Sequence, residues 1–124
     1  MPTVTVEGGQ TIKVAEGRRL AIAIEDAGTD IGHRCGGFAR CTTCRVEFVS
    51  GEPSVFTRAE YAKLKERGLL GQVRLSCQIV VEDDVTVKPL MTVSEMGWAD
   101  PGPPLEETVT PEPDWIAGTS ADLD

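Results

Sequence analysis

The chain has 124 residues and a formal net charge of −8, and that charge is unevenly distributed. Basic and acidic residues balance over residues 1–90, whereas residues 91–124 contain eight acidic residues and no lysine or arginine. A neutral body joined to an acidic end offers no basic surface for a nucleic acid, and the length is small for an enzyme with its own substrate pocket.

The start of the chain has the alternating pattern of a β-strand and not that of a secretory signal. Val4 and Val6 alternate with threonine, without the basic and apolar regions of a signal peptide. No apolar run approaches the ~18 residues that a membrane span requires. Four cysteines in such a chain favour a metal site over disulfides. We therefore expect a soluble, cytoplasmic protein without a membrane partner.

The elements predicted after this strand are those of a small α+β domain. A hairpin is predicted over residues 3–14 with its turn at Gly8–Gly9, and a helix over Arg18–Ala27. A second helix is predicted over residues 58–66, where Thr57 and Glu60 form a capping box. The remaining predicted strands are Cys44–Val49, Val73–Ile79 and Val85–Val87. This order predicts a mixed sheet with a helix packed on it.

Three of the four cysteines lie within ten residues, between the first helix and the strand that follows it. Cys35, Cys41 and Cys44 have the spacing C-x5-C-x2-C, and Cys77 follows after a gap of 32 residues. Four thiolates of this kind can hold an iron–sulfur cluster or a zinc ion. Zinc sites most often use two short knuckles, and only one C-x2-C unit is present. A 2Fe–2S cluster suits one loop plus a distant cysteine, and Gly36–Gly37 lets backbone N–H groups approach the sulfurs.

The segments Cys35–Cys44 and Leu75–Gln78 resemble those of the 2Fe–2S ferredoxins, and the gap of five resembles the adrenodoxin and putidaredoxin branch. The resemblance covers residues 3–90. It implies a β-grasp (ubiquitin-like) fold with one main helix and a smaller second helix, and a one-electron carrier that is not itself an enzyme. The implied ligands are Cys35 and Cys41 on one iron, and Cys44 and Cys77 on the other.

The implied partners are a flavin-dependent ferredoxin reductase and a downstream redox acceptor such as an oxygenase. The adrenodoxin branch has an acidic recognition helix, whereas Arg58–Arg67 is net positive here. Recognition is therefore expected from the acidic C-terminal segment or from arginines around the cysteine loop. Those arginines are Arg34, Arg40 and Arg45.

Two other functions stay open for the four cysteines. One is a non-redox binding module with a structural zinc ion, and the other is a carrier that serves iron–sulfur cluster assembly. His33 is the single histidine of the chain, so a Rieske centre, which needs two, is excluded. We expect His33 to have a surface or loop-packing role.

Residues 91–124 form a predicted C-terminal extension of different composition. The segment holds five of the eight prolines and both tryptophans, Trp98 and Trp115. Proline and acid alone indicate disorder, but a large aromatic side chain usually has a surface to bury against. We therefore predict that Trp98, and with it Trp115, docks on the protein's own sheet or on a neighbouring copy, which would be tail-mediated self-association.

Overall fold

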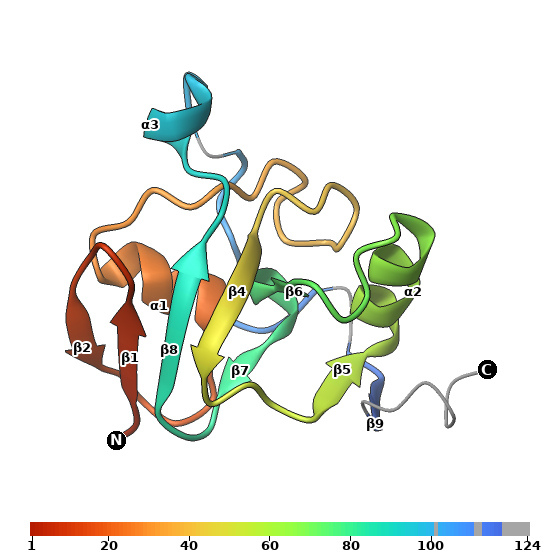
Figure 1. Cartoon of the computed structure of the whole chain (residues 1–124), viewed down its shortest axis with the longest axis horizontal. Helices are drawn as coiled ribbons and strands as arrows, with labels where there is room; N and C mark the ends of the chain where they lie inside the picture. The colour runs from red at the N-terminus through yellow and green to blue at the C-terminus, as the bar shows by residue number, and fades with distance from the viewer. Residues whose placement is uncertain (101, 111–112, 118–124) are drawn as a thin grey trace.

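The computed structural model of the protein describes residues 1–100, 102–110 and 113–117. Its main element is a five-stranded mixed sheet with the strand order β2-β1-β8-β4-β6 (Figure 1). Strands β1 and β8 run parallel, and the other neighbouring pairs are antiparallel. The strands of this sheet are β1 (Thr3–Val6), β2 (Thr11–Lys13), β8 (Val85–Pro89), β4 (Arg45–Ser50) and β6 (Arg74–Leu75). The predicted α+β class is confirmed.

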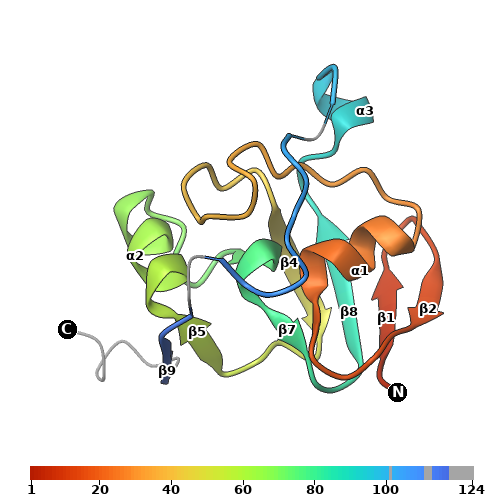
Figure 2. The same cartoon turned by 180° about the vertical axis from the view of Figure 1, so that it is seen from behind.

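One face of the sheet carries the main apolar core. Alternation puts Val4, Val6 and Val87 on the covered face, where each is at most 2% exposed. Helix α1 (Leu20–Asp26) packs Leu20 and Ile24 onto the same core. Figure 2 shows α1 lying across this face of the sheet. The core therefore fixes Leu20 at the start of α1, the end of the helix that lies near the segment of Cys77.

The first helix is shorter than the predicted Arg18–Ala27. Arg18–Arg19 instead forms strand β3, which pairs antiparallel with β7 (Val80–Val81). Arg19 has the extended backbone of an N-cap residue, and its side chain is fully buried. The two arginines are therefore held in a strand by pairing with a segment far along the chain, which a periodicity argument cannot detect.

The second helix, α2 (Arg58–Glu66), has the predicted bounds but only half of the predicted capping box. Thr57 Oγ1 accepts the N–H of Glu60 at 3.0 Å. The Glu60 carboxylate does not return to the cap, because it accepts from Arg74 and from the N–H of Leu75 instead. Helix α2 has nine residues and α1 has seven, so α2 is the longer helix, while α1 covers the main core. A second core lies between α2, β5 (Val55–Thr57) and the cysteines.

The strand predicted over Val73–Ile79 is broken by a turn. Strand β6 ends at Leu75, the 3-10 turn η1 (Ser76–Gln78) follows, and β7 then pairs with β3. The chain leaves the five-stranded sheet here to reach a second strand partner. Cys77 consequently lies on a turn and not within a strand.

The C-terminal segment packs back onto the domain. After the short helix α3 (Val93–Met96), residues 102–110 run along the rear of the molecule, and strand β9 (Trp115–Ala117) pairs with β5 (Figure 2). A β-carbon placed on Gly32 would lie 2.6 Å from Cζ3 of Trp98. Trp98 therefore docks on its own chain as predicted, but against Gly32, just before the loop that holds Cys35, Cys41 and Cys44, and not on the sheet. Trp115 remains 40% exposed. Within the part of the chain described, no helix is long and apolar enough to cross a membrane.

Candidate metal centre

The cysteine loop (residues 33–46) has a backbone that turns repeatedly into the left-handed region. Gly36 and Gly37 have φ values of 73° and 89°, and the non-glycine residues Ala39 and Thr42 have φ values of 59° and 58°. Left-handed alanine and threonine cost free energy and mark a backbone that its surroundings hold in place. Such a backbone points successive N–H groups toward one concave side, which favours anions. The sequence indicated the glycines but gave no signal for Ala39 or Thr42.

The structure brings the four predicted cysteines together as two pairs. Cys35 and Cys41 lie close enough for their thiols to shift each other's pKa, and so do Cys44 and Cys77. The first pair is half-buried and the second is buried. Ser76 links the two segments, because its N–H and its hydroxyl both donate to the carbonyl of Cys44, at 3.2 Å and 2.8 Å. The distant cysteine is thereby fixed against the loop.

Each pair favours one thiolate. The pKa of Cys35 is lowered to about 4, first by the hydrogen bond from the Cys41 thiol and then by backbone N–H groups, while burial opposes the shift. One of those donors is the N–H of Arg40, 3.4 Å from Cys35 Sγ. In the second pair the Cys44 thiol lowers the pKa of Cys77, and the same contact raises the pKa of Cys44. One sulfur of each pair, that of Cys35 and that of Cys77, is therefore stabilised as the thiolate, which is the form that binds a metal. The same contacts raise the pKa of Cys41 and of Cys44.

The arrangement of the donors suits two metal ions better than one. Among the described residues, no three His, Cys, Asp or Glu side chains form a set that could hold a single ion. A 2Fe–2S cluster is bound by four cysteine thiolates, two at each iron, and the thiols lie here as two pairs. A structural zinc ion would instead need all four donors around one point. The residues present fit a 2Fe–2S cluster.

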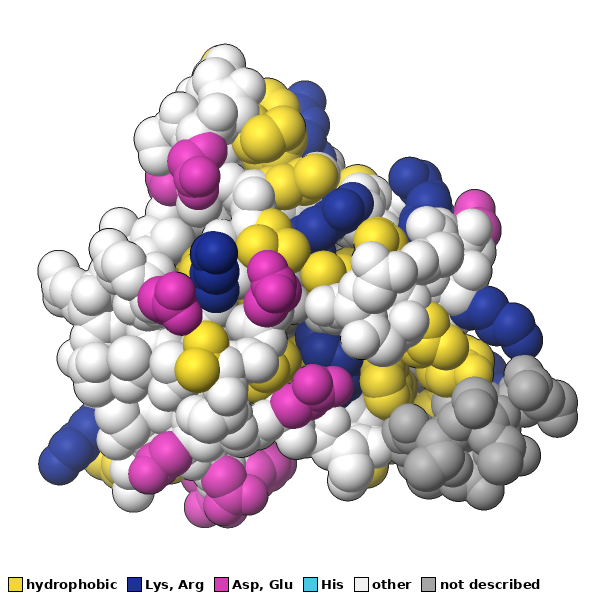
Figure 3. Space-filling view, in the orientation of Figure 1, with side chains coloured by type: hydrophobic (Ala, Val, Ile, Leu, Met, Phe, Trp, Pro, Cys, Tyr) yellow, Lys and Arg dark blue, Asp and Glu magenta, His cyan; other side chains and the backbone are white. Residues whose placement is uncertain are grey.

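The rim of the loop is basic and aromatic. Arg34 lies over the Trp98 ring at 5.2 Å, and Arg40 lies over the Phe38 ring at 5.9 Å. Phe38 is 40% exposed. Arg45 differs from the other two arginines, because it donates to the carbonyl and the hydroxyl of Thr42 at 3.0 Å and 2.6 Å. In Figure 3, hydrophobic and basic side chains gather at the end of the molecule between α3 and α2, where the cysteine loop lies in Figure 1.

His33 packs inside the loop, as one of its two expected roles requires. Its side chain is 3% exposed, and Nε2 contacts Oε2 of Glu25 at 2.8 Å. Burial acts to lower the pKa of His33, but the hydrogen bond and the charge of Glu25 act in the opposite direction, and the net shift is upward. His33 thus ties the start of the cysteine loop to the last turn of α1.

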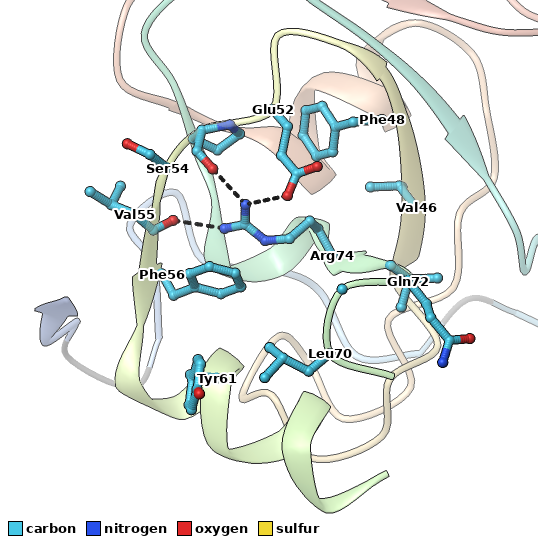
Figure 4. A pocket seen from close by; sticks show the side chains of 13 residues that line it. Val46, Phe48, Glu52, Ser54, Val55, Phe56, Tyr61, Leu70, Gln72 and Arg74 are labelled. Carbon is cyan, nitrogen blue, oxygen red and sulfur yellow. Dashed lines mark hydrogen bonds and ion pairs between the residues drawn. The ribbon is translucent and has the colours of Figure 1, made fainter. Parts of the chain in front are cut away.

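A separate hollow of about 720 Å³ lies between β4, β5 and α2 (Figure 4). Its described lining contains none of the cysteines, but it does contain Arg74, whose guanidinium lies 3.8 Å from the centre of the Phe56 ring. Arg74 donates to Glu60, to the Pro53 carbonyl and to the Val55 carbonyl. These contacts brace α2 against the sheet, so the hollow is a structural feature next to the metal centre.

Two buried residues outside the predicted ligand set contact the cysteine loop directly. Arg19 donates to the carbonyls of Cys77 and Gly37, both at 2.7 Å. Gln78 donates to the Gly37 carbonyl at 3.0 Å and lies 3.6 Å from Cys77 Sγ. Gln78 belongs to the segment Leu75–Gln78 that carries the resemblance, but its contact with Gly37 was not predicted. Nothing in the sequence indicated the burial of Arg19, because it stands as a polar residue at the start of a predicted helix.

Comparisons with known proteins agree with this site. A family model described as "2Fe-2S iron-sulfur cluster binding domain" matches residues 4–82. A 2Fe-2S ferredoxin of Haemophilus influenzae is 34% identical over 84 residues, covering 64% of this chain and 74% of that protein. A component of the Na(+)-translocating NADH-quinone reductase of Neisseria meningitidis is 30% identical over 86 residues, covering 69% of this chain. This chain spans only 21% of the length of that reductase component.

Solved structures show the same likeness in three dimensions. The ISC-like 2Fe-2S ferredoxin from Pseudomonas putida has a TM-score of 0.59 and 30% sequence identity, covering 71% of this chain and 91% of that one. A reduced putidaredoxin variant from the same species has a TM-score of 0.51 and 27% identity, covering 73% of this chain and 96% of the other. The likeness confirms the predicted β-grasp fold.

Proposed function

The chain belongs to the family of 2Fe-2S cluster binding domains and its cofactor is a 2Fe-2S cluster; from this premise we propose that it is a cytoplasmic one-electron carrier whose cluster is held by Cys35, Cys41, Cys44 and Cys77. The observation that carries the ligand assignment is that the four thiols lie as two neighbouring pairs, with the segment of Cys77 held against the cysteine loop by the bonds from Ser76 to the Cys44 carbonyl. Cytoplasmic placement is supported by the four cysteines, all of which are free thiols in the structure.

When bound, a 2Fe-2S cluster supplies the one-electron redox step. The chain supplies the thiolates, the N–H groups that point at sulfur, and a shell that excludes water on one side. Cys44 and Cys77 lie on the buried side, and Cys35 and Cys41 lie on the half-exposed side. We therefore assign the exchange of electrons with partners to the side of Cys35 and Cys41.

The proposed partners are a flavin-dependent ferredoxin reductase and an oxygenase-like acceptor. Each would dock on the rim around Cys35, where Arg34 and Arg40 are exposed beside the half-exposed ring of Phe38. These side chains fit an acidic surface with an apolar centre, because complementary charge steers encounter and fixes orientation. Helix α2 adds little to this polarity, because Arg58 pairs with Asp114 and Lys63 pairs with Glu66.

We further propose that residues 1–90 form the cluster-binding domain and residues 91–124 an extension of it. The contacts of Trp98 support an extension that docks on its own domain. Self-association through the tail stays a second proposal. The two alternative functions, a structural zinc module and a carrier for cluster assembly, are not favoured by these observations.

Metal and sulfide analysis of the full-length protein tests the ligand assignment. We expect iron and acid-labile sulfide in equal amounts, with visible absorption that bleaches on reduction. Cys41→Ser and Cys77→Ser each remove one thiolate from a different pair, so each is expected to lose most of the bound iron. A colourless wild-type protein containing zinc would overturn the proposed function, and full iron retention in either variant would overturn that ligand.

A further inference from the structure

Arg19 is a fully buried arginine whose partners are all uncharged. Its exposed fraction is 0%. Five acceptors surround the guanidinium, four of them backbone carbonyls and one a hydroxyl. They are the carbonyls of Cys77, Gly37, Glu106 and Thr108 and the Oγ1 of Thr110, at distances of 2.7 to 3.2 Å. Each N–H group of the guanidinium has an acceptor, but none of these acceptors is an anion that could neutralise its positive charge.

No ion pair in the described part of the chain includes Arg19. A buried charge without a counter-charge is strongly unfavourable, because nothing compensates the desolvation of the ion. An anion close to the guanidinium would compensate this penalty. Two acceptors of Arg19 belong to Gly37, in the cysteine loop, and to Cys77 itself. Four thiolates bound to two irons and two sulfides carry net negative charge, and they would lie just beyond these carbonyls.

Arg19 also fixes the orientation of one peptide group of the loop. The Gly37 carbonyl accepts from Arg19 at 2.7 Å and from Gln78 at 3.0 Å. A trans peptide is planar, so the N–H of the next residue points away from that carbonyl. The next residue is Phe38, whose N–H is one of the donors to the sulfur of Cys35. Because Arg19 and Gln78 hold the Gly37 carbonyl on one side of the peptide, the N–H of Phe38 on the opposite side points toward the sulfur of Cys35.

The C-terminal extension closes the remaining side of Arg19. Two carbonyls and a hydroxyl among its five acceptors belong to the strap, which we define as residues 102–110. Leu105 lies over Gly37, because a β-carbon on Gly37 would be 2.6 Å from Cδ2 of Leu105. Figure 2 shows this part of the chain running past the start of α1. The strap keeps water from the guanidinium, so the charge of Arg19 is only weakly screened.

We propose that Arg19 is a positioning residue of the cluster site: its guanidinium is the buried counter-charge of the cluster, and it orients the peptide that joins Gly37 to Phe38. This inference rests on the proposed function. A weakly screened positive charge stabilises the reduced cluster more than the oxidised one, because reduction adds a negative charge. Arg19 is therefore expected to raise the midpoint potential.

The test is the midpoint potential of full-length, cluster-loaded protein in three variants. Arg19→Gln removes the charge and keeps a hydrogen-bond donor, and Arg19→Lys keeps the charge. Arg18→Gln is the matched control, because Arg18 is the neighbouring residue and forms an exposed ion pair with Asp26. We expect Arg19→Gln to weaken reduction by about tenfold, which is a downward shift of about 59 mV for a one-electron couple. Arg19→Lys should shift less than Arg19→Gln, and Arg18→Gln should leave the potential unchanged.

Equal potentials in wild type and Arg19→Gln would overturn the inference, as would an equal shift in Arg18→Gln. If Arg19→Gln does not take up the cluster, cluster content becomes the readout. Uptake by Arg19→Lys would then support the counter-charge, whereas equal failure of both variants would reduce Arg19 to a structural support. Absence of a 2Fe-2S cluster from the wild type would instead mean that the proposed function fails.

Discussion

At the scale of single residues, the centre depends on backbone conformations that few side chains allow. Gly37 has a φ of 89°, and its missing side chain leaves room for Arg19 and Leu105. A methyl group there would have to displace the guanidinium and the leucine together. Gly71 has a similar φ of 83°, but a β-carbon on it would meet nothing within 4 Å. Alanine substitutions at the two glycines therefore distinguish the cost of backbone strain from the cost of crowding.

Gly37→Ala is expected to lower the free energy of unfolding of the loaded protein by more than Gly71→Ala does. Both variants incur roughly 1–2 kcal/mol of left-handed backbone strain. Only Gly37→Ala also disturbs the contacts of Arg19 and the N–H that faces Cys35. Urea unfolding and the rate at which the visible absorption bleaches measure the two effects. Equal losses in both variants would contradict the account of Gly37.

Much of the centre at this scale could be predicted from the sequence. The spacing of Cys35, Cys41, Cys44 and Cys77 indicated a four-thiolate site, since metal ligands must be of a particular residue type. Arg19 could not be predicted, because any arginine next to a helix start is expected to be exposed. Its burial depends on a strap that begins 83 residues later in the chain. Long-range contacts of this kind leave no local pattern.

At the scale of secondary-structure elements, α2 is held by a buried ion pair. Glu60 is 0% exposed, and its Oε2 accepts from Nε of Arg74 at 2.8 Å. The sequence correctly predicted the start of α2 at Thr57, because a threonine followed by an acid three residues on is a local signal. The true partner of Glu60 lies on β6, and local spacing says nothing of it. The same limitation explains why β3 was predicted as the beginning of α1.

Removing one partner of this pair should be costly. Glu60→Gln removes the buried counter-charge of Arg74 and leaves it only Glu52, an exposed carboxylate whose Oε2 lies 3.4 Å from Nη1 of Arg74. The expected cost is about 3 kcal/mol in the free energy of unfolding, the lower end of the range for breaking a buried pair. Glu66→Gln is the matched control on the same helix, because its ion pair with Lys63 lies at the surface, where water and salt screen it. Denaturant unfolding of the two loaded variants makes the comparison. A loss below about 1 kcal/mol in Glu60→Gln, the range of a surface pair, would show that the pair does not hold α2.

At the scale of the whole molecule, the described residues of the acidic C-terminal extension are part of the folded structure. Strand β9 pairs with β5, and Asp114 forms an ion pair with Arg58 at 2.9 Å. Trp98 meets Gly32 at the start of the cysteine loop. Composition predicted that a tryptophan of this segment would dock, but it could not say where, since the docking surface is built from distant parts of the chain.

The two tryptophans are expected to differ in importance. Trp98→Ala removes a half-buried ring that supports both Gly32 and Arg34, so it should lower the free energy of unfolding by about 2 kcal/mol, below the cost for a fully buried ring. It should also speed loss of the cluster. Trp115→Ala should cost less than about 1 kcal/mol, because the ring is 40% exposed on an outer strand. A larger drop in melting temperature, or faster bleaching, in Trp115→Ala than in Trp98→Ala would contradict this prediction.

The central claim is that the two thiol pairs hold one 2Fe-2S cluster that carries single electrons. An electron paramagnetic resonance titration of the full-length, cluster-loaded protein tests it most directly. We expect one reversible one-electron transition and, in the reduced form, one unpaired spin for every two irons. A protein that shows no spin signal at any potential, or whose signal does not return after reoxidation and a second reduction, would contradict it.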